Sequence, residues 1–170
     1  MVLLFSNRKN KLEKEIIEIL TACGGDFISD KAVHITGGLF TVNIFYKKTD
    51  IEAQKGIVLL LDDTSRFENQ EIPKGLIAVC EENNRKALEI IKNSGAPVVT
   101  CGINPKNTLT VVGFEKESFI ISLQREITDI NGKTVLPFDF KINFAKNHSP
   151  QAIIMCCAII LLLGLDITSH

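Results

Sequence analysis

The sequence has 170 residues, of which 45% are hydrophobic and 23% charged, and its formal net charge is −1. A chain of this length forms one domain with its own apolar core, and this composition excludes an intrinsically disordered protein. The near balance of acidic and basic side chains provides no strong field for nucleic acid or an anionic membrane. We therefore expect one globular domain over residues 1–170, with neither nucleic acid nor a membrane as a partner.

The cysteines and the two most apolar segments favour a cytoplasmic protein. The five cysteines are Cys23, Cys80, Cys101, Cys156 and Cys157. Their spacing gives no disulfide framework, and the N-terminus becomes basic too early for a signal peptide. The uncharged run at residues 152–165 is fourteen residues long, whereas a membrane span needs roughly 20, so we expect a buried core helix there.

The first elements predict an α/β unit. Residues 2–6 (VLLFS) form a continuous apolar run that is typical of a buried central strand. Leu12, Ile16 and Leu20 then recur at helical spacing, and Gly24-Gly25 ends the helix. Strand, turn and helix in this order begin an α/β domain.

The next segments predict a hairpin and then a parallel sheet. The glycine pair between residues 32–36 and 39–46 indicates a β-hairpin or meander with one solvated face. Three further apolar strands are expected at residues 56–61, 76–80 and 97–101, with a helix at 83–92. Uncharged strands that alternate with helices favour a parallel sheet covered on both faces.

From residue 109 the hydrophobic pattern changes to a period of two, which predicts an antiparallel patch. The Asn131-Gly132 dipeptide indicates a hairpin of the tight two-residue kind. Ser149 as N-cap and Pro150 as first residue predict a last helix, which ends at Gly164. The fold class is therefore α/β, a three-layer αβα domain with a mostly parallel sheet, an antiparallel β-patch and a buried C-terminal helix.

The second half resembles the central, ATP-binding domain of the Mur ligases over roughly residues 75–167. The resemblance lies in the order of the elements, in residues 98–102 (VVTCG), in His148 and in the helix that contains Met155-Cys156-Cys157-Ala158. It implies the same three-layer fold, a nucleotide site with ATP and Mg²⁺, and His148 as one of its residues.

The resemblance is incomplete at the positions that would bind the nucleotide. The loop at residues 6–11 (SNRKNK) has no glycine and no GK[ST] ending, although Arg8 and Lys9 would attract a phosphate at the helix N-terminus. Residues of this kind more often simply solvate a loop. Ser149 and Ala152 stand where the family has asparagines on the adenine side, and the family's C-terminal domain does not follow residue 170.

Asp62 and Asp63 follow an apolar strand, and carboxylates at that place bind Mg²⁺ in nucleotide enzymes. The same residues also suit a turn. His34, His148 and His170 have no further ligand at metal spacing, so we expect no metal site of the protein's own.

Three functional hypotheses follow. We favour a non-catalytic Mur-ligase-like protein with a binding or regulatory role and no required cofactor. The second is a nucleotide-binding enzyme with an atypical site made of Arg8, Lys9, Asp62, Asp63 and His148. The third is a homo-oligomeric assembly protein that packs one face of its apolar C-terminal helix on a partner or a second copy.

Overall fold

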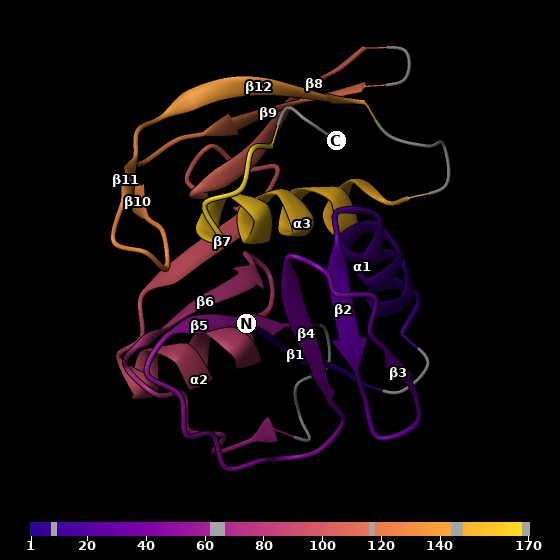
Figure 1. Ribbon diagram of the computed structural model, residues 1–170. Coiled ribbons are helices and arrows are strands. Elements are labelled where there is room, and N and C mark those ends of the chain that lie inside the picture. Colours follow the sequence, from indigo (N-terminus) through magenta and orange to yellow (C-terminus); the bar gives the residue numbers. More distant parts are fainter. Residues whose placement is uncertain (8–9, 62–66, 116–117, 144–147, 168–170) are drawn as a thin grey trace.

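The computed structural model describes the chain except residues 8–9, 62–66, 116–117, 144–147 and 168–170. Within the described residues the core is a ten-stranded sheet with the strand order β12-β9-β8-β7-β6-β5-β1-β4-β2-β3 (Figure 1). These strands are β1 (Val2–Phe5), β2 (Gly25–Ile28), β3 (Val33–His34), β4 (Phe40–Phe45), β5 (Gly56–Leu60), β6 (Leu76–Glu81), β7 (Val98–Gly102), β8 (Leu109–Glu115), β9 (Ser118–Leu123) and β12 (Phe138–Asn143). The strands from β2 to β8 in this order are mutually parallel, and β3, β9 and β12 pair antiparallel with their neighbours. The predicted α/β class and mostly parallel sheet are confirmed.

The two faces of the sheet are covered by different helices, which gives the three predicted layers. Successive residues of β1 point to opposite faces, so Val2 and Leu4 join one apolar cluster while Leu3 and Phe5 join the other. Helices α1 (Lys11–Ala22) and α3 (Pro150–Leu162) cover the first face, and α2 (Arg85–Ser94) covers the second.

Helix α3 lies in the middle of the first face, beside α1 and beneath β8, β9 and β12 (Figure 1). Every residue from Ala152 to Leu162 is buried, so the helix contacts protein all round. The predicted buried core helix is confirmed. The expectation that one face of this helix packs on a partner is wrong, because the chain's own α1 and sheet cover it.

Strand β4 does not form the predicted hairpin with the segment before it. It lies inside the sheet, parallel to both β1 and β2, while β3 pairs antiparallel with β2. Asp26 causes this path, because its carboxylate accepts hydrogen bonds from the backbone N–H groups of Thr36 (2.7 Å) and Gly38 (3.0 Å). The segment before β4 therefore crosses the start of β2. The approach is so close that a Cβ atom at Gly38 would lie 2.3 Å from the Gly24 carbonyl oxygen.

The antiparallel patch is β8, β9 and β12, as expected after residue 109. A small separate hairpin of β10 (Ile127–Thr128) and β11 (Thr134–Val135) connects β9 to β12. Its loop is residues 129–133, longer than the predicted two-residue turn, because the Asp129 carboxylate accepts the N–H groups of Asn131 and Lys133. Gly132 does take the predicted left-handed conformation, with φ of 84°.

No helix in the described part of the chain combines the length and apolar character needed to cross a membrane.

Candidate functional site

The carboxyl ends of β1 and β5 form the place where this topology favours a ligand. From β1 the chain passes through α1 to β2 and β4 on one side, whereas β5 lies on the other side of β1. Crevices at such a switch point, outside the carboxyl ends of parallel strands, are the usual binding sites of open α/β sheets. In the sequence, the predicted phosphate loop comes directly after β1 and the predicted acidic pair comes directly after Leu61, next to the end of β5.

Arg8, Lys9, Asp62 and Asp63 all lie outside the described residues. Hydrogen bonds from Ser6 N to the Phe45 oxygen (3.1 Å) and from Leu61 N to the Phe5 oxygen (3.1 Å) continue the sheet to the positions just before them. The side chain of Asn84, the N-cap of α2, donates to the Leu61 oxygen (3.0 Å) and so ties the next strand end to the same edge.

The N-terminus of α1 carries a carboxylate of the chain itself. Asn10 is the N-cap and its Oδ1 accepts from Leu12 N at 2.9 Å. One residue further on, Glu13 is only 8% exposed, and its Oε1 accepts from the Tyr46 hydroxyl at the end of β4 at 2.8 Å. A negative charge in the first turn stabilises the helix dipole, which is the same interaction that a bound phosphate makes.

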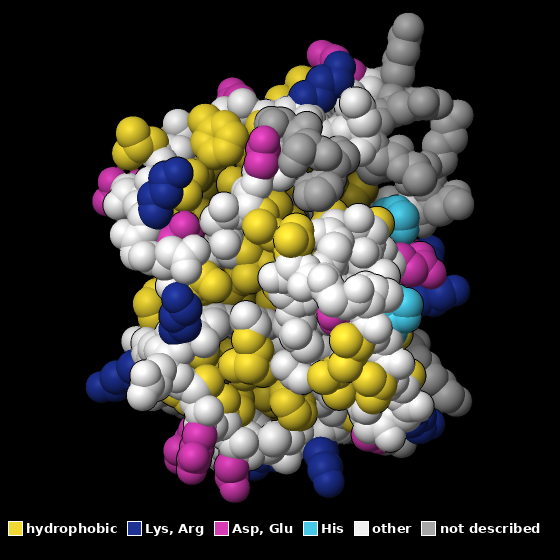
Figure 2. Space-filling model, in the orientation of Figure 1, with side chains coloured by type: hydrophobic (Ala, Val, Ile, Leu, Met, Phe, Trp, Pro, Cys, Tyr) yellow, Lys and Arg dark blue, Asp and Glu magenta, His cyan; other side chains and the backbone are white. Residues whose placement is uncertain are grey.

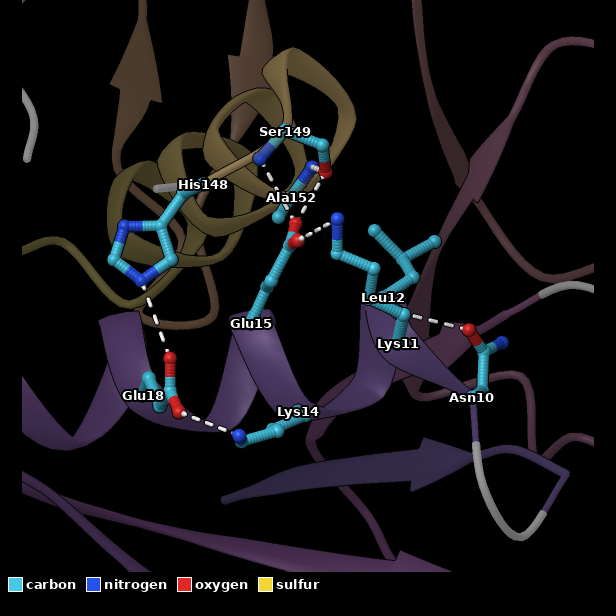
Figure 3. Close-up of polar contacts among 9 residues, drawn as sticks. All are labelled: Asn10, Lys11, Leu12, Lys14, Glu15, Glu18, His148, Ser149 and Ala152. Carbon is cyan, nitrogen blue, oxygen red and sulfur yellow. Dashed lines mark hydrogen bonds and ion pairs between the residues drawn. The ribbon is translucent and has the colours of Figure 1, made fainter. Parts of the chain in front are cut away.

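The N-terminus of α3 is occupied in the same way. Figure 3 shows Glu15 of α1 pointing at Ser149, whose backbone N–H (2.8 Å) and Oγ (2.5 Å) both donate to Glu15 Oε2. Ser149 Oγ in turn accepts from Ala152 N, as expected of an N-cap. Burial raises the pKa of the Glu15 carboxyl, but the hydrogen bonds from Ser149 and the charge of Lys11 outweigh it, so the pKa lies below its usual value.

His148 lies apart from the phosphate loop. Its Nε2 is 3.4 Å from Glu18 Oε2, and the other oxygen of that carboxylate, Oε1, lies 3.7 Å from Lys14 Nζ. Glu18 is eight residues after Asn10, about 12 Å further along the helix axis, and Figure 3 shows Asn10 and His148 at opposite ends of the group. Among the described residues, His148 is therefore joined to the surface of α1 and not to the strand ends.

Glu13 and Glu15 stand between the apolar positions of the first helix, yet both are buried. Their positions among Lys11, Lys14 and Glu18 are typical of an exposed stripe. The contacts that bury them come from Tyr46 and Ser149, which are 33 and 134 residues away in the sequence. No local pattern carries that information.

Two hollows adjoin these elements. One of about 390 Å³ lies at the carboxyl ends of β2 and β4, with polar lining from Asp30, Asn43, Tyr46 and Lys47. The other, about 250 Å³ and mostly apolar, lies between α1, α3 and β12 near His148. The first is on the edge where parallel sheets bind ligands, and it presents both signs of charge together with hydroxyl and amide groups.

The cysteines supply no nucleophile and the described residues no metal centre. Burial raises the pKa of Cys80, which also faces the charge of Glu81, to about 12, and burial raises that of Cys101 well above its usual value. Thiols in this state are protonated and inert at neutral pH. Within the described ranges, no three His, Cys, Asp or Glu side chains are grouped so as to hold a metal ion.

Solved structures of Mur ligases share this fold. The MurF ligase from Thermotoga maritima in complex with ADP is 11% identical and superposes with a TM-score of 0.53. The UDP-N-acetylmuramate:L-alanyl-gamma-D-glutamyl-meso-diaminopimelate ligase from Neisseria meningitides is 13% identical, also with a TM-score of 0.53. Each match covers 98% of this chain but only 46% and 62%, respectively, of the ligase. Neither a protein-family model nor a curated protein sequence matches the chain.

Proposed function

We propose that the chain is a non-catalytic Mur-ligase-like domain with a binding or regulatory role, on a fold that its structural neighbours use for ligation. The fold supports the ancestry, and a fold by itself does not carry the chemistry of its relatives. The proposal therefore depends on what the chain has placed at the positions where a nucleotide phosphate would bind.

The observation that carries the proposal is the Glu13 carboxylate in the first turn of α1. It is buried, and Tyr46 holds it by a 2.8 Å hydrogen bond. A phosphate bound at this helix N-terminus would meet a like charge in a poorly solvated place, where repulsion is strongest. The loop before it has no glycine to let backbone N–H groups wrap a phosphate.

At the two positions where the family has adenine-side asparagines, this chain also has residues that serve its own fold. Ser149, where the family has an asparagine, is the N-cap of α3 and donates two hydrogen bonds to Glu15. Ala152, at the second such position, is completely buried. Both residues have structural roles that a ligand-binding asparagine would disturb. The polar hollow at the ends of β2 and β4 is lined by Tyr46, the hydrogen-bond partner of Glu13, and offers a binding place near the first turn of α1.

A nucleotide-binding enzyme is the second candidate, favoured by one observation. The stretches with Arg8, Lys9 and Asp62, Asp63 follow adjacent parallel strands, at the edge where ligands bind in such sheets. In that hypothesis Lys9 holds a phosphate of ATP and the two aspartates bind Mg²⁺, although Glu13 stands in the first turn of the helix that follows the loop.

Calorimetric titration of ATP with excess Mg²⁺ separates the two candidates. The proposal expects no saturable heat and no thermal stabilisation for the wild type up to millimolar ATP. Saturable binding that Lys9→Ala weakens, while the control Lys14→Ala on the exposed side of α1 does not, would overturn it in favour of the enzyme. Glu13→Gln keeps the size of the side chain and removes its charge. Titration of this variant measures how far the Glu13 charge prevents ATP from binding.

A further inference from the structure

Strand β12 forms one edge of the sheet and is long for an edge strand. It pairs with β9 over all six residues from Phe138 to Asn143, and no other described strand pairs with it. The opposite edge, β3, has only two residues. An edge of this length presents a row of backbone N–H and C=O groups that another strand can pair with.

The side chains of β12 alternate between an apolar and a charged face. Phe138, Phe140 and Ile142 lie opposite Leu123, Ile121 and Phe119 of β9, on the face that carries α3. Phe138 remains 38% exposed, and hydrophobic side chains reach the surface along β12 at the top of Figure 2. Asp139 and Lys141 are exposed on the other face.

This order of residues is complementary to itself. Two copies of the strand placed antiparallel about Phe140 bring Asp139 of each copy opposite Lys141 of the other, and Phe138 opposite Ile142. Residues directly opposite in an antiparallel pair share a face and are in contact, so both ion pairs and both apolar pairs form together. A two-fold symmetric contact repeats each favourable pair.

We propose that the chain forms a homodimer in which the β12 strands of two copies pair antiparallel about Phe140 and join the two sheets into one. This interface does not depend on whether the chain binds a nucleotide. It takes the place of α3, which is buried, as the surface for self-association. The charged side chains of β12 favour a second copy of the chain as the partner of this edge. In the described residues the Asp139 carboxylate has no ionic or hydrogen-bonding partner, and Lys141 is bound only to Glu115 (2.6 Å), in a pair that is half exposed.

Sedimentation velocity over a concentration series tests the proposal with the full chain. The wild type is expected to sediment as a reversible dimer. Asp139→Lys places two pairs of lysines face to face, and Lys141→Asp two pairs of aspartates, so each variant should dimerise at least about tenfold more weakly. The double variant Asp139→Lys with Lys141→Asp restores both ion pairs in the opposite sense and should dimerise like the wild type.

Mixing the two single variants gives the sharpest result, because in the mixed dimer every lysine again faces an aspartate. The mixture should form heterodimers although each variant alone is largely monomeric. Glu115→Gln is the matched control, since it removes the intrachain partner of Lys141 without changing β12, and it should leave dimerisation intact. Unchanged circular dichroism of all variants establishes that they are folded. A wild type that stays monomeric into the submillimolar range, or single variants that dimerise as tightly as the wild type, would overturn the proposal.

Discussion

Glu15 Oε2 and Ser149 Oγ lie 2.5 Å apart, and through this contact the first helix of the chain caps the last one. The same carboxylate oxygen also accepts the Ser149 backbone N–H, so the N-cap of α3 is itself held in place by α1. The two helices are 134 residues apart in sequence at this point and lie side by side on the sheet.

Glu15→Ala should destabilise the protein by about 2 kcal/mol. The substitution removes a buried ionised acceptor, so the Ser149 N–H and hydroxyl lose their hydrogen-bond partner. Chemical denaturation followed by circular dichroism measures this. Glu18→Ala is the matched control on the same helix, since Glu18 is half exposed and should cost well under 1 kcal/mol. In a double-mutant cycle with Ser149→Ala, the double variant should lose clearly less stability than the sum of the two single losses, because both substitutions remove the same contact. Equal losses for the Glu15 and Glu18 variants would contradict the assigned role.

Asp26 gives an expected pH dependence. Hydrogen bonds from the backbone N–H groups of Thr36 and Gly38 hold the pKa of Asp26 below its usual value of 3.8. A carboxyl whose pKa is lower in the folded state stabilises the fold fully above its unfolded pKa, and this contribution is lost as the pH falls through the folded pKa. The stability difference between wild type and Asp26→Asn should therefore be constant near neutrality and shrink below about pH 4. Thermal melts at several pH values measure it, with the exposed Asp50→Asn as control. A difference that persists unchanged to low pH would show that the charge is unimportant.

The five thiols should be unreactive in the native protein at neutral pH. All five are buried, and burial, with the neighbouring Cys23, raises the pKa of Cys157 to about 12, so the reactive thiolate is scarce. A chromogenic disulfide reagent should release almost no colour from the folded chain and the full five equivalents after denaturation. Rapid titration of one thiol before unfolding would contradict the placement of that cysteine.

Ile159 probes the packing of α3, because it is completely buried in the apolar cluster that α3 forms with α1 and the sheet. Ile159→Ala should cost about 3 kcal/mol and Ile159→Val about 1 kcal/mol, since the larger truncation leaves the larger cavity. Equilibrium unfolding in urea gives both values. Similar small losses for the two variants would mean that α3 is loosely packed, contrary to its position here.

The sequence was sufficient for the parallel strands β1, β5, β6 and β7, for the three helices and for the buried nature of the last helix, because these depend on local hydrophobic period and on capping residues such as Ser149 and Gly24. It failed at β4. The alternation in residues 39–46 is the same for an edge hairpin and for a central strand with one half-covered face. The choice is made by Asp26, which binds backbone groups ten and twelve residues ahead.

The candidate site likewise has parts that follow from the sequence and parts that do not. The carboxyl ends of β1 and β5 are adjacent because the two strands pair in parallel, whereas Arg8, Lys9, Asp62 and Asp63 lie outside the described residues, so their part in the site stays a prediction. The separation of His148 from that edge could not be predicted, because it depends on where α3 begins relative to α1. The burial of Glu13 likewise requires Tyr46 from another strand.

The central position of α3 has a consequence for synthesis of the protein on the ribosome. All strands of the sheet precede this helix in the chain, yet the face between α1 and β8 stays uncovered until the helix arrives. A nascent chain that has emerged only as far as β12 exposes the apolar side chains that α3 will cover, and such surfaces attract chaperones or aggregate. Completion of this face of the fold thus waits for α3 to leave the exit tunnel.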